Sequence, residues 1–194
     1  MRARLLALLA PMALALSACG INSIPTAEEN AKARWADVQS QYQRRADLIP
    51  NLVRTVGAFA DQEREVLTQV TEARARAGTV QVDPTNAQAV QNFANAQAEL
   101  GSALSRLLVT VERYPELRSS EQFATLMSQL EGTENRIQIA RRDYNAAVQA
   151  YNTRIRTFPD LVGARVIYGS EPMVPFEAQE GAERAPTVDL GNRQ

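Results

Sequence analysis

Apolar side chains recur at intervals of three and four residues through most of this chain, and this spacing restricts its fold more than any other feature. A helix places residues three and four apart on one face, whereas a half-buried strand needs apolar and polar residues in alternation. The chain contains no alternating stretch of any length, so the sequence predicts an all-α domain. The first apolar row consists of Trp35, Val38, Tyr42, Ile49, Leu52, Val56, Phe59, Val66, Val70, Ala73 and Ala77.

Pro50 lies inside this first row. A proline in a helix interior costs about 3 kcal/mol, because it removes a hydrogen bond and clashes with the preceding turn. The sequence therefore predicts a helix that is either kinked at Pro50 or split there into two, with Asp47 as the cap of the second part. The apolar row crosses Pro50 without a slip, which favours one kinked helix.

A second row, from Val90 to Tyr114, predicts another long helix. Residues 78–82 form the expected connection, and Asp83-Pro84 has the order of an N-cap followed by proline at the first helical position. Pro115 is expected to end this helix.

The third row repeats every seven residues from Phe123 to Phe158, after a cap at Ser119 or Ser120. One short extra helix is expected over residues 161–168. Because the connections are short, neighbouring helices should run antiparallel, as in an up-and-down bundle.

The N-terminus has the order of an export signal: Arg2 and Arg4, then an apolar stretch from Leu5 to Leu16, then small residues. As a helix, the apolar stretch would cover only about 18 Å of a hydrocarbon core that is roughly 30 Å thick. A lasting transmembrane helix is therefore not expected, and residues 1–18 are interpreted as a signal peptide.

Cys19 is the only cysteine, and Leu16–Gly20 resembles the bacterial lipobox, in which this residue is lipidated and becomes the N-terminus. The alternative is a plain signal peptide with a buried or free cysteine, but an exported lone cysteine lacks a disulfide partner. Residues 19–27 would then be the lipidated cysteine and a short linker. Because Gly20 follows the cysteine, a periplasmic domain on the outer membrane is favoured over one on the inner membrane.

The composition excludes several kinds of function. The chain has no histidine and a formal net charge of −1, so histidine-based catalysis and a basic nucleic-acid surface are not expected. No glycine-rich phosphate loop, nucleophile elbow or metal-binding spacing occurs. We therefore expect no catalytic residues, no metal, no cofactor and no nucleic-acid partner.

Charged residues interrupt the apolar rows at Arg45, Glu63, Glu134 and Arg141. An unpaired buried charge costs several kcal/mol, so an ion-pair layer between helices is one interpretation. The other is a pocket for a small acidic or lipid-like ligand, because paired arginines can grip an acidic group with forked hydrogen bonds. The arginines of that pocket would be Arg44, Arg45, Arg141 and Arg142.

The pair Tyr144-Asn145 recurs seven residues later as Tyr151-Asn152, which places each residue type on one helical stripe. Core packing with asparagine bonds across helices is one interpretation, and a binding groove is the other. Residues 169–194 carry prolines and many small polar residues, and we expect a disordered tail there.

Two separated stretches, Arg44–Val53 and Asn135–Asn145, together with Tyr151-Asn152 and Phe158-Pro159, closely resemble the LemA family of bacterial membrane proteins. The resemblance implies a helical bundle over residues 28–168, held at a membrane by its N-terminus and without established enzymatic activity. The residues that we select for binding a partner or ligand are Arg44, Arg45, Asp47, Pro50, Asn51, Glu134, Asn135, Arg141, Arg142, Tyr144 and Asn145.

The expected function is that of a non-enzymatic, lipid-anchored adaptor or scaffold that docks other envelope or membrane proteins. The alternative is a module that binds a small acidic or lipid-like ligand between helices, near the paired arginines.

Overall fold

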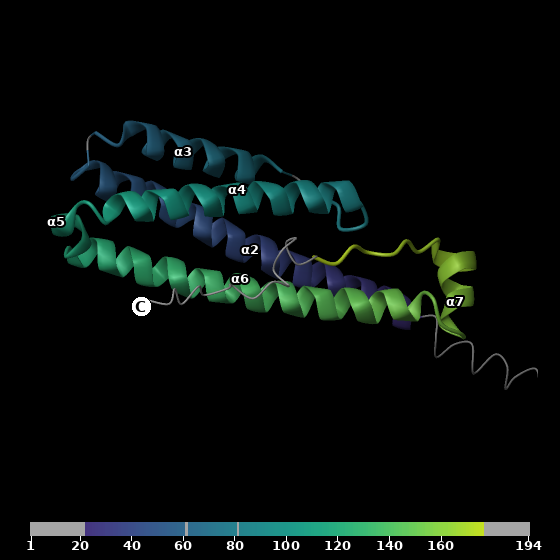
Figure 1. Cartoon of the computed structure of the whole chain (residues 1–194). Coiled ribbons are helices and arrows are strands. Elements are labelled where there is room, and N and C mark those ends of the chain that lie inside the picture. Colours follow the sequence, from purple (N-terminus) through teal and green to yellow (C-terminus); the bar gives the residue numbers. More distant parts are fainter. Residues whose placement is uncertain (1–21, 61, 81, 177–194) are drawn as a thin grey trace, which may run out of the picture.

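A computed structural model of the chain describes residues 22–60, 62–80 and 82–176 (Figure 1). Within these residues the regular elements are all helices, so the predicted all-α class is confirmed. No helix in this part of the chain is long and apolar enough to cross a membrane. The predicted signal peptide, Cys19 and the final residues of the predicted tail lie outside the described residues.

Four long helices form an antiparallel up-and-down bundle (Figure 1). The helices α2 (Ser23–Gly57) and α6 (Glu121–Arg154) lie side by side and make the most extensive contact in the fold. The helix α3 (Arg64–Thr79) packs on α2 and also on α4 (Ala87–Val111). The connections are short, as the sequence predicted for antiparallel neighbours.

Shorter helical pieces complete the chain at both ends of the bundle. The helix α5 (Pro115–Arg118) links α4 to α6. After α6, the helix α7 (Asp160–Gly163) continues into the π-helix η1 (Ala164–Tyr168), which agrees with the short extra helix expected at 161–168.

The first apolar row belongs to two helices, but the split is not at Pro50. The helix α2 passes through Pro50 and ends at Gly57, and the chain reverses before Arg64. The predicted split at Pro50 was wrong in position, and the preference for one kinked helix was wrong because of this reversal. The apolar row keeps its phase because Val56 and Val70, on opposite sides of the reversal, face the same core.

Two helix starts also differ from the prediction. The helix α2 begins at Ser23, ahead of residue 28, and carries Pro25 in its first turn, where a missing N–H is tolerated. The helix α4 begins only after Asn86, whose side chain accepts a 3.1 Å hydrogen bond from Ala89 N.

Asp83 does not cap α4. Its carboxylate accepts bonds of 2.9 Å from the backbone N and 2.8 Å from the hydroxyl of Thr85, and so closes a turn before the helix. Ser120 caps α6 as predicted, because its hydroxyl accepts a bond of 3.3 Å from Phe123 N.

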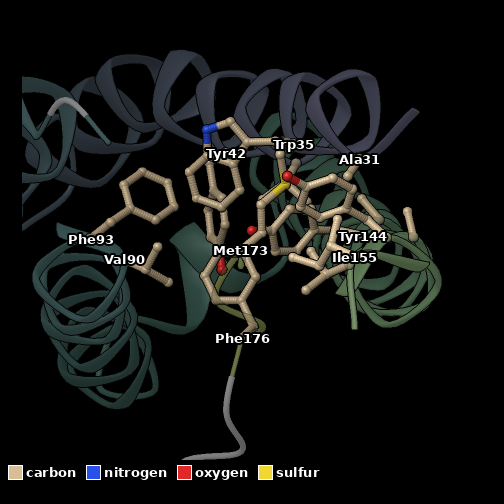
Figure 2. Packing of buried hydrophobic residues seen from close by; sticks show 14 of the residues in the cluster. Ala31, Trp35, Tyr42, Val90, Phe93, Tyr144, Ile155, Met173 and Phe176 are labelled. Carbon is tan, nitrogen blue, oxygen red and sulfur yellow. The ribbon is translucent and has the colours of Figure 1, made fainter. Parts of the chain in front are cut away.

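The core has two parts along the bundle. The part between α2, α3 and α4 near the reversal is mainly aliphatic and includes Leu52, Leu100 and Leu107, all fully buried. The part at the other end is aromatic and gathers around Trp35 (Figure 2). This second part also buries Met173 and Phe176, which follow the last helix.

Residues 169–176 are therefore an exception to the predicted disorder. After Gly169, whose φ of 58° suits a residue without a Cβ, the chain turns back along the bundle in extended form. Figure 1 shows this segment running back between α4 and α6. The composition indicated disorder, but the segment is held by contacts with residues distant in the sequence.

Candidate functional site

The aromatic end of the bundle is a groove that holds the segment Glu171–Phe176, called the C-terminal segment below. Phe176 is 5% exposed and lies among rings from three helices (Figure 2). Its ring stacks on Trp35 of α2 with centroids 5.3 Å apart at 22°. It meets Tyr144 of α6 edge to face at 5.7 Å and Phe93 of α4 at 6.3 Å.

Two asparagines of α6 bind the backbone of this segment. Asn145 Nδ2 donates to Phe176 O at 2.9 Å, and its Oδ1 accepts from Phe176 N at 2.8 Å. Asn152 makes the same two bonds with Met173. Its Nδ2 donates to Met173 O at 2.8 Å, and its Oδ1 accepts from Met173 N at 2.9 Å. Each side-chain amide therefore pairs with both backbone groups of one residue, as a neighbouring strand would.

The spacing of the two asparagines matches an extended chain. They are seven residues apart on one helix, which corresponds to about 10.5 Å along the axis. Met173 and Phe176 are three residues apart, and an extended chain covers about 10 Å over that interval. A single helix face can therefore bind every third residue of an extended segment.

Three further backbone groups of the segment are also bound. The hydroxyls of Tyr144 and Tyr151 donate to Val174 O at 2.8 Å and to Glu171 O at 3.1 Å. Val174 N donates to Pro84 O at 2.9 Å, in the connection before α4. Since proline has no N–H, Pro172 and Pro175 need no acceptor, and each backbone N–H from 173 to 176 has one.

Electrostatics support the same arrangement. Burial raises the pKa of Tyr144 well above its ordinary value, so its hydroxyl stays protonated and able to donate. Burial also raises the pKa values of Tyr42 and Tyr151. The guanidinium of Arg141 lies 5.0 Å from the centre of the Phe176 ring, in the range of a cation–π contact.

Arg45 lies in a separate polar layer of the core and is 7% exposed. Its guanidinium donates to Glu134 Oε2 at 3.2 Å, to Gln97 Oε1 at 2.7 Å and to Gln97 O at 3.2 Å. This is the interhelical ion-pair arrangement that the sequence allowed. Glu63 belongs elsewhere, since it accepts from Arg113 at 2.8 Å and from the Tyr114 hydroxyl at 3.1 Å.

The structure brings together only part of the predicted binding set. Arg141, Tyr144 and Asn145 surround the C-terminal segment, and Arg45 pairs with Glu134. The other members have exposed side chains: Arg44, Asp47, Pro50, Asn51, Asn135 and Arg142.

Asn51 lines two open grooves at the far end of the bundle, the larger of ≈ 570 Å³. Neither groove is lined by Arg45 or Arg141. Because Arg45 already donates to groups of this chain, the arginine pocket for an acidic ligand has no support in this geometry. Among the described residues, no group of three or more His, Cys, Asp or Glu could hold a metal ion.

Sequence reasoning missed several residues of the groove. Trp35 and Phe93 were assigned only to apolar rows, because one-dimensional spacing does not show which rings meet. The repeat of tyrosine and asparagine was the usable signal, since it left a groove open as an interpretation. The prolines at 172 and 175 were the second signal, because apolar residues follow each of them at the same interval.

These features define the class of protein: an all-helical bundle that holds an extended segment in a groove between its helices. A model of the LemA family matches residues 34–190, a range that includes the groove and the C-terminal segment. Because this match covers most of the chain, the protein belongs to the LemA family.

Curated relatives agree with this assignment. The chain is similar to Magnetosome protein MamQ 2 of Paramagnetospirillum magneticum, with 26% identity over 157 residues, 71% of this chain and 58% of the relative. Magnetosome protein MamQ of Magnetospirillum gryphiswaldense is 25% identical with the same coverage. Protein LemA of Metamycoplasma hominis is 22% identical over 121 residues, 62% of this chain and 52% of the relative. The chain thus spans just over half the length of these relatives.

Proposed function

We propose that this protein is a lipid-anchored adaptor of the cell envelope that docks other envelope proteins by binding their extended segments in the groove between α4 and α6. The role is non-enzymatic. It rests on one observation, the pairing of Asn145 and Asn152 with both backbone groups of Phe176 and Met173. Such bonds are directed at the main chain, so they serve any extended segment whose side chains fit.

The side chains of the C-terminal segment, which fills the groove, indicate which residues a partner segment would need. Met173 and Phe176 are buried, whereas Pro172 and Pro175 are exposed and have no backbone N–H that needs an acceptor. A partner segment would therefore carry an apolar or aromatic residue directly after each of two prolines spaced three residues apart. It would enter the groove by displacing the C-terminal segment of this chain.

The anchor is part of the same proposal. The lipobox-like stretch Leu16–Gly20 supports lipidation of Cys19, and Gly20 supports delivery to the outer membrane with the bundle in the periplasm. Labelling cells with a fatty-acid probe tests this directly. The wild-type chain should take up label and fractionate with outer membrane, whereas Cys19→Ala should take up none. A wild-type chain without label would overturn the anchor.

Peptide binding tests the groove. The probe is a fluorescent synthetic hexapeptide that copies Glu171–Phe176, titrated into the purified full-length protein while its polarisation is measured. In the wild type, the attached segment competes at high effective concentration, so binding should be weak. Phe176→Ala weakens that competitor and should bind the probe several-fold more tightly.

Matched controls use the same helix. On the Phe176→Ala background, Asn145→Ala should abolish probe binding, whereas Asn135→Ala, at an exposed position of α6, should leave it unchanged. A probe with alanine in place of methionine and phenylalanine should not bind. Equal binding by all three proteins, with unchanged helical content, would rule out the groove as a peptide site.

A further inference from the structure

Large apolar side chains are exposed at the end of the bundle formed by α7 and η1. Monomeric proteins rarely leave such groups clustered in water unless they meet a partner or a membrane. The members and their exposed fractions are Phe158 at 84%, Val162 at 54%, Val166 at 79%, Ile167 at 58% and Tyr168 at 40%. They are called the apolar tip below.

The apolar tip is a compact feature of the local sequence. Phe158, Val162 and Val166 follow one another at intervals of four residues, so the two valines lie one turn apart on the same side of the helix. Ala164 faces the opposite way and is 1% exposed. The short helical pair therefore buries its Ala164 side chain and exposes both of its valines.

Charges around the tip suit an anionic surface. Arg156 and Arg165 are exposed beside it. Of the acidic groups near the tip, Asp160 is paired, since its Oδ2 accepts from the Ser23 hydroxyl at 2.8 Å and lies 3.8 Å from Arg154, while Glu171 is exposed three residues after Tyr168. Free positive charge next to exposed apolar and tyrosine side chains is the pattern of segments that lie in a membrane interface.

The start of α2 lies against the same tip. The Ser23 hydroxyl donates to Asp160, and the Ile24 side chain lies close to Gly163. If Gly163 carried a Cβ, that atom would be 3.4 Å from Ile24 Cδ1. Four residue steps join Cys19 to Ser23, a reach of at most roughly 14 Å. A lipid on Cys19 is therefore confined to the end of the bundle that carries the apolar tip.

We propose that the apolar tip is a membrane-contact surface, seated in the headgroup region of the bilayer with Arg156 and Arg165 at anionic lipids. The orientation rests on the lipid anchor of the proposed function, while the contact itself rests on the exposed side chains. The long axis of the bundle then points away from the membrane surface, because the reversal between α2 and α3 is at the end opposite the apolar tip (Figure 1).

The test places an environment-sensitive dye at two matched positions of the full lipidated chain. Acylation consumes the thiol of Cys19, so Val166→Cys and Val109→Cys each present one site for an NBD label. Val166 is 79% exposed on the tip, and Val109 is 66% exposed near the C-terminal end of α4, which leads into α5. Both proteins are reconstituted into phosphatidylglycerol-containing vesicles, with or without lipids that carry a nitroxide near the headgroup.

The label at Val166 should shift its emission to the blue and lose intensity several-fold to the nitroxide lipids, while the label at Val109 does neither. Equal quenching at the two positions, in protein whose mass shows the lipid, would overturn the contact and leave the anchor intact. If the mass shows no lipid, the anchor fails. The same comparison, with vesicles added to unlipidated chains that also carry Cys19→Ala and so keep a single thiol, then tests the contact alone.

Two further readings identify the occupant. Arg156→Ala with Arg165→Ala should weaken the quenching at Val166 in anionic vesicles and not in neutral ones. The blue shift of the label at Val166 could instead rise with protein concentration, with no quenching by the nitroxide lipids. That result would show that the tip contacts a second copy of this chain, and it would overturn the proposal.

Discussion

The Nε of Arg74 donates a 2.7 Å hydrogen bond to the carbonyl oxygen of Ala46, the acceptor that Pro50 leaves without a helical donor. In an unbroken helix the amide four residues later would bind this carbonyl, and proline has none. A side chain of α3 thus supplies the missing donor in α2. This bond helps to stabilise α2 where the helix continues through Pro50.

We expect Arg74→Met to lower the free energy of unfolding by about 1–3 kcal/mol, because it leaves a partly buried carbonyl without a donor. In a Pro50→Ala background the restored amide can bind Ala46 O, and the same substitution should cost clearly less. Urea denaturation of the wild type, the two single variants and the double variant measures the coupling between Arg74 and Pro50. Arg76→Met is the control, since its ion pair with Glu99 is exposed and worth under about 1 kcal/mol. Equal losses in both backgrounds would contradict the role of Arg74.

Gln97 should matter more than Glu134 for holding Arg45. The Glu134 side chain is 49% exposed, so Glu134→Gln should cost under about 1 kcal/mol. Gln97→Leu removes the 2.7 Å acceptor from a buried guanidinium and should cost about 1.5–3 kcal/mol. Adding Arg45→Met should recover much of this loss, since it removes the buried charge. Chemical denaturation ranks these proteins, and the opposite order for Gln97 and Glu134 would refute the argument.

Phe176→Ala should release the C-terminal segment from the groove and leave the bundle folded. Its ring is buried against Trp35, so we expect a red shift of tryptophan emission and a loss of up to about 3 kcal/mol. Trp35 is the only tryptophan, which makes the signal specific. Phe158→Ala, at a ring that is 84% exposed, should change stability by less than about 0.5 kcal/mol. An unchanged emission spectrum would show that the segment does not cover Trp35.

Stability should fall at alkaline pH. Burial raises the pKa values of Tyr42, Tyr144 and Tyr151 above the ordinary 10.0, so the folded chain keeps protons that the unfolded chain loses. The free energy of unfolding should be level below pH 10.0 and fall as the pH rises toward the raised values. Denaturation in a series of buffers measures this. Tyr144→Phe should make the decline shallower, and an unchanged decline would exclude Tyr144 as a contributor.

Sequence reasoning located the helices because their signals are local. Apolar rows marked the buried faces, and cap chemistry narrowed the start of the last long helix to Ser119 or Ser120, of which Ser120 is the cap. Asp83-Pro84 misled because a side chain that caps a turn looks the same in sequence as one that caps a helix.

The groove could be predicted only in part. The repeat of Tyr144-Asn145 and Tyr151-Asn152 indicated a polar stripe beside an aromatic one, but not its occupant. That occupant follows 20 to 31 residues later in the chain, in a stretch whose composition suggested disorder. Composition indicates whether a segment can fold by itself. Here the segment is ordered by its contacts with a surface that other helices form.

The sequence by itself determined that this protein is an all-helical bundle, which faces of its helices are buried, and that its N-terminus resembles a lipoprotein signal. Only the tertiary structure decided where the first row reverses and what fills the groove. The physical reason is the same in both cases. Ala46 O, freed by Pro50, and the backbone of Met173 and Phe176 lack partners within their own segments, and buried polar groups of this kind find them only where distant segments meet.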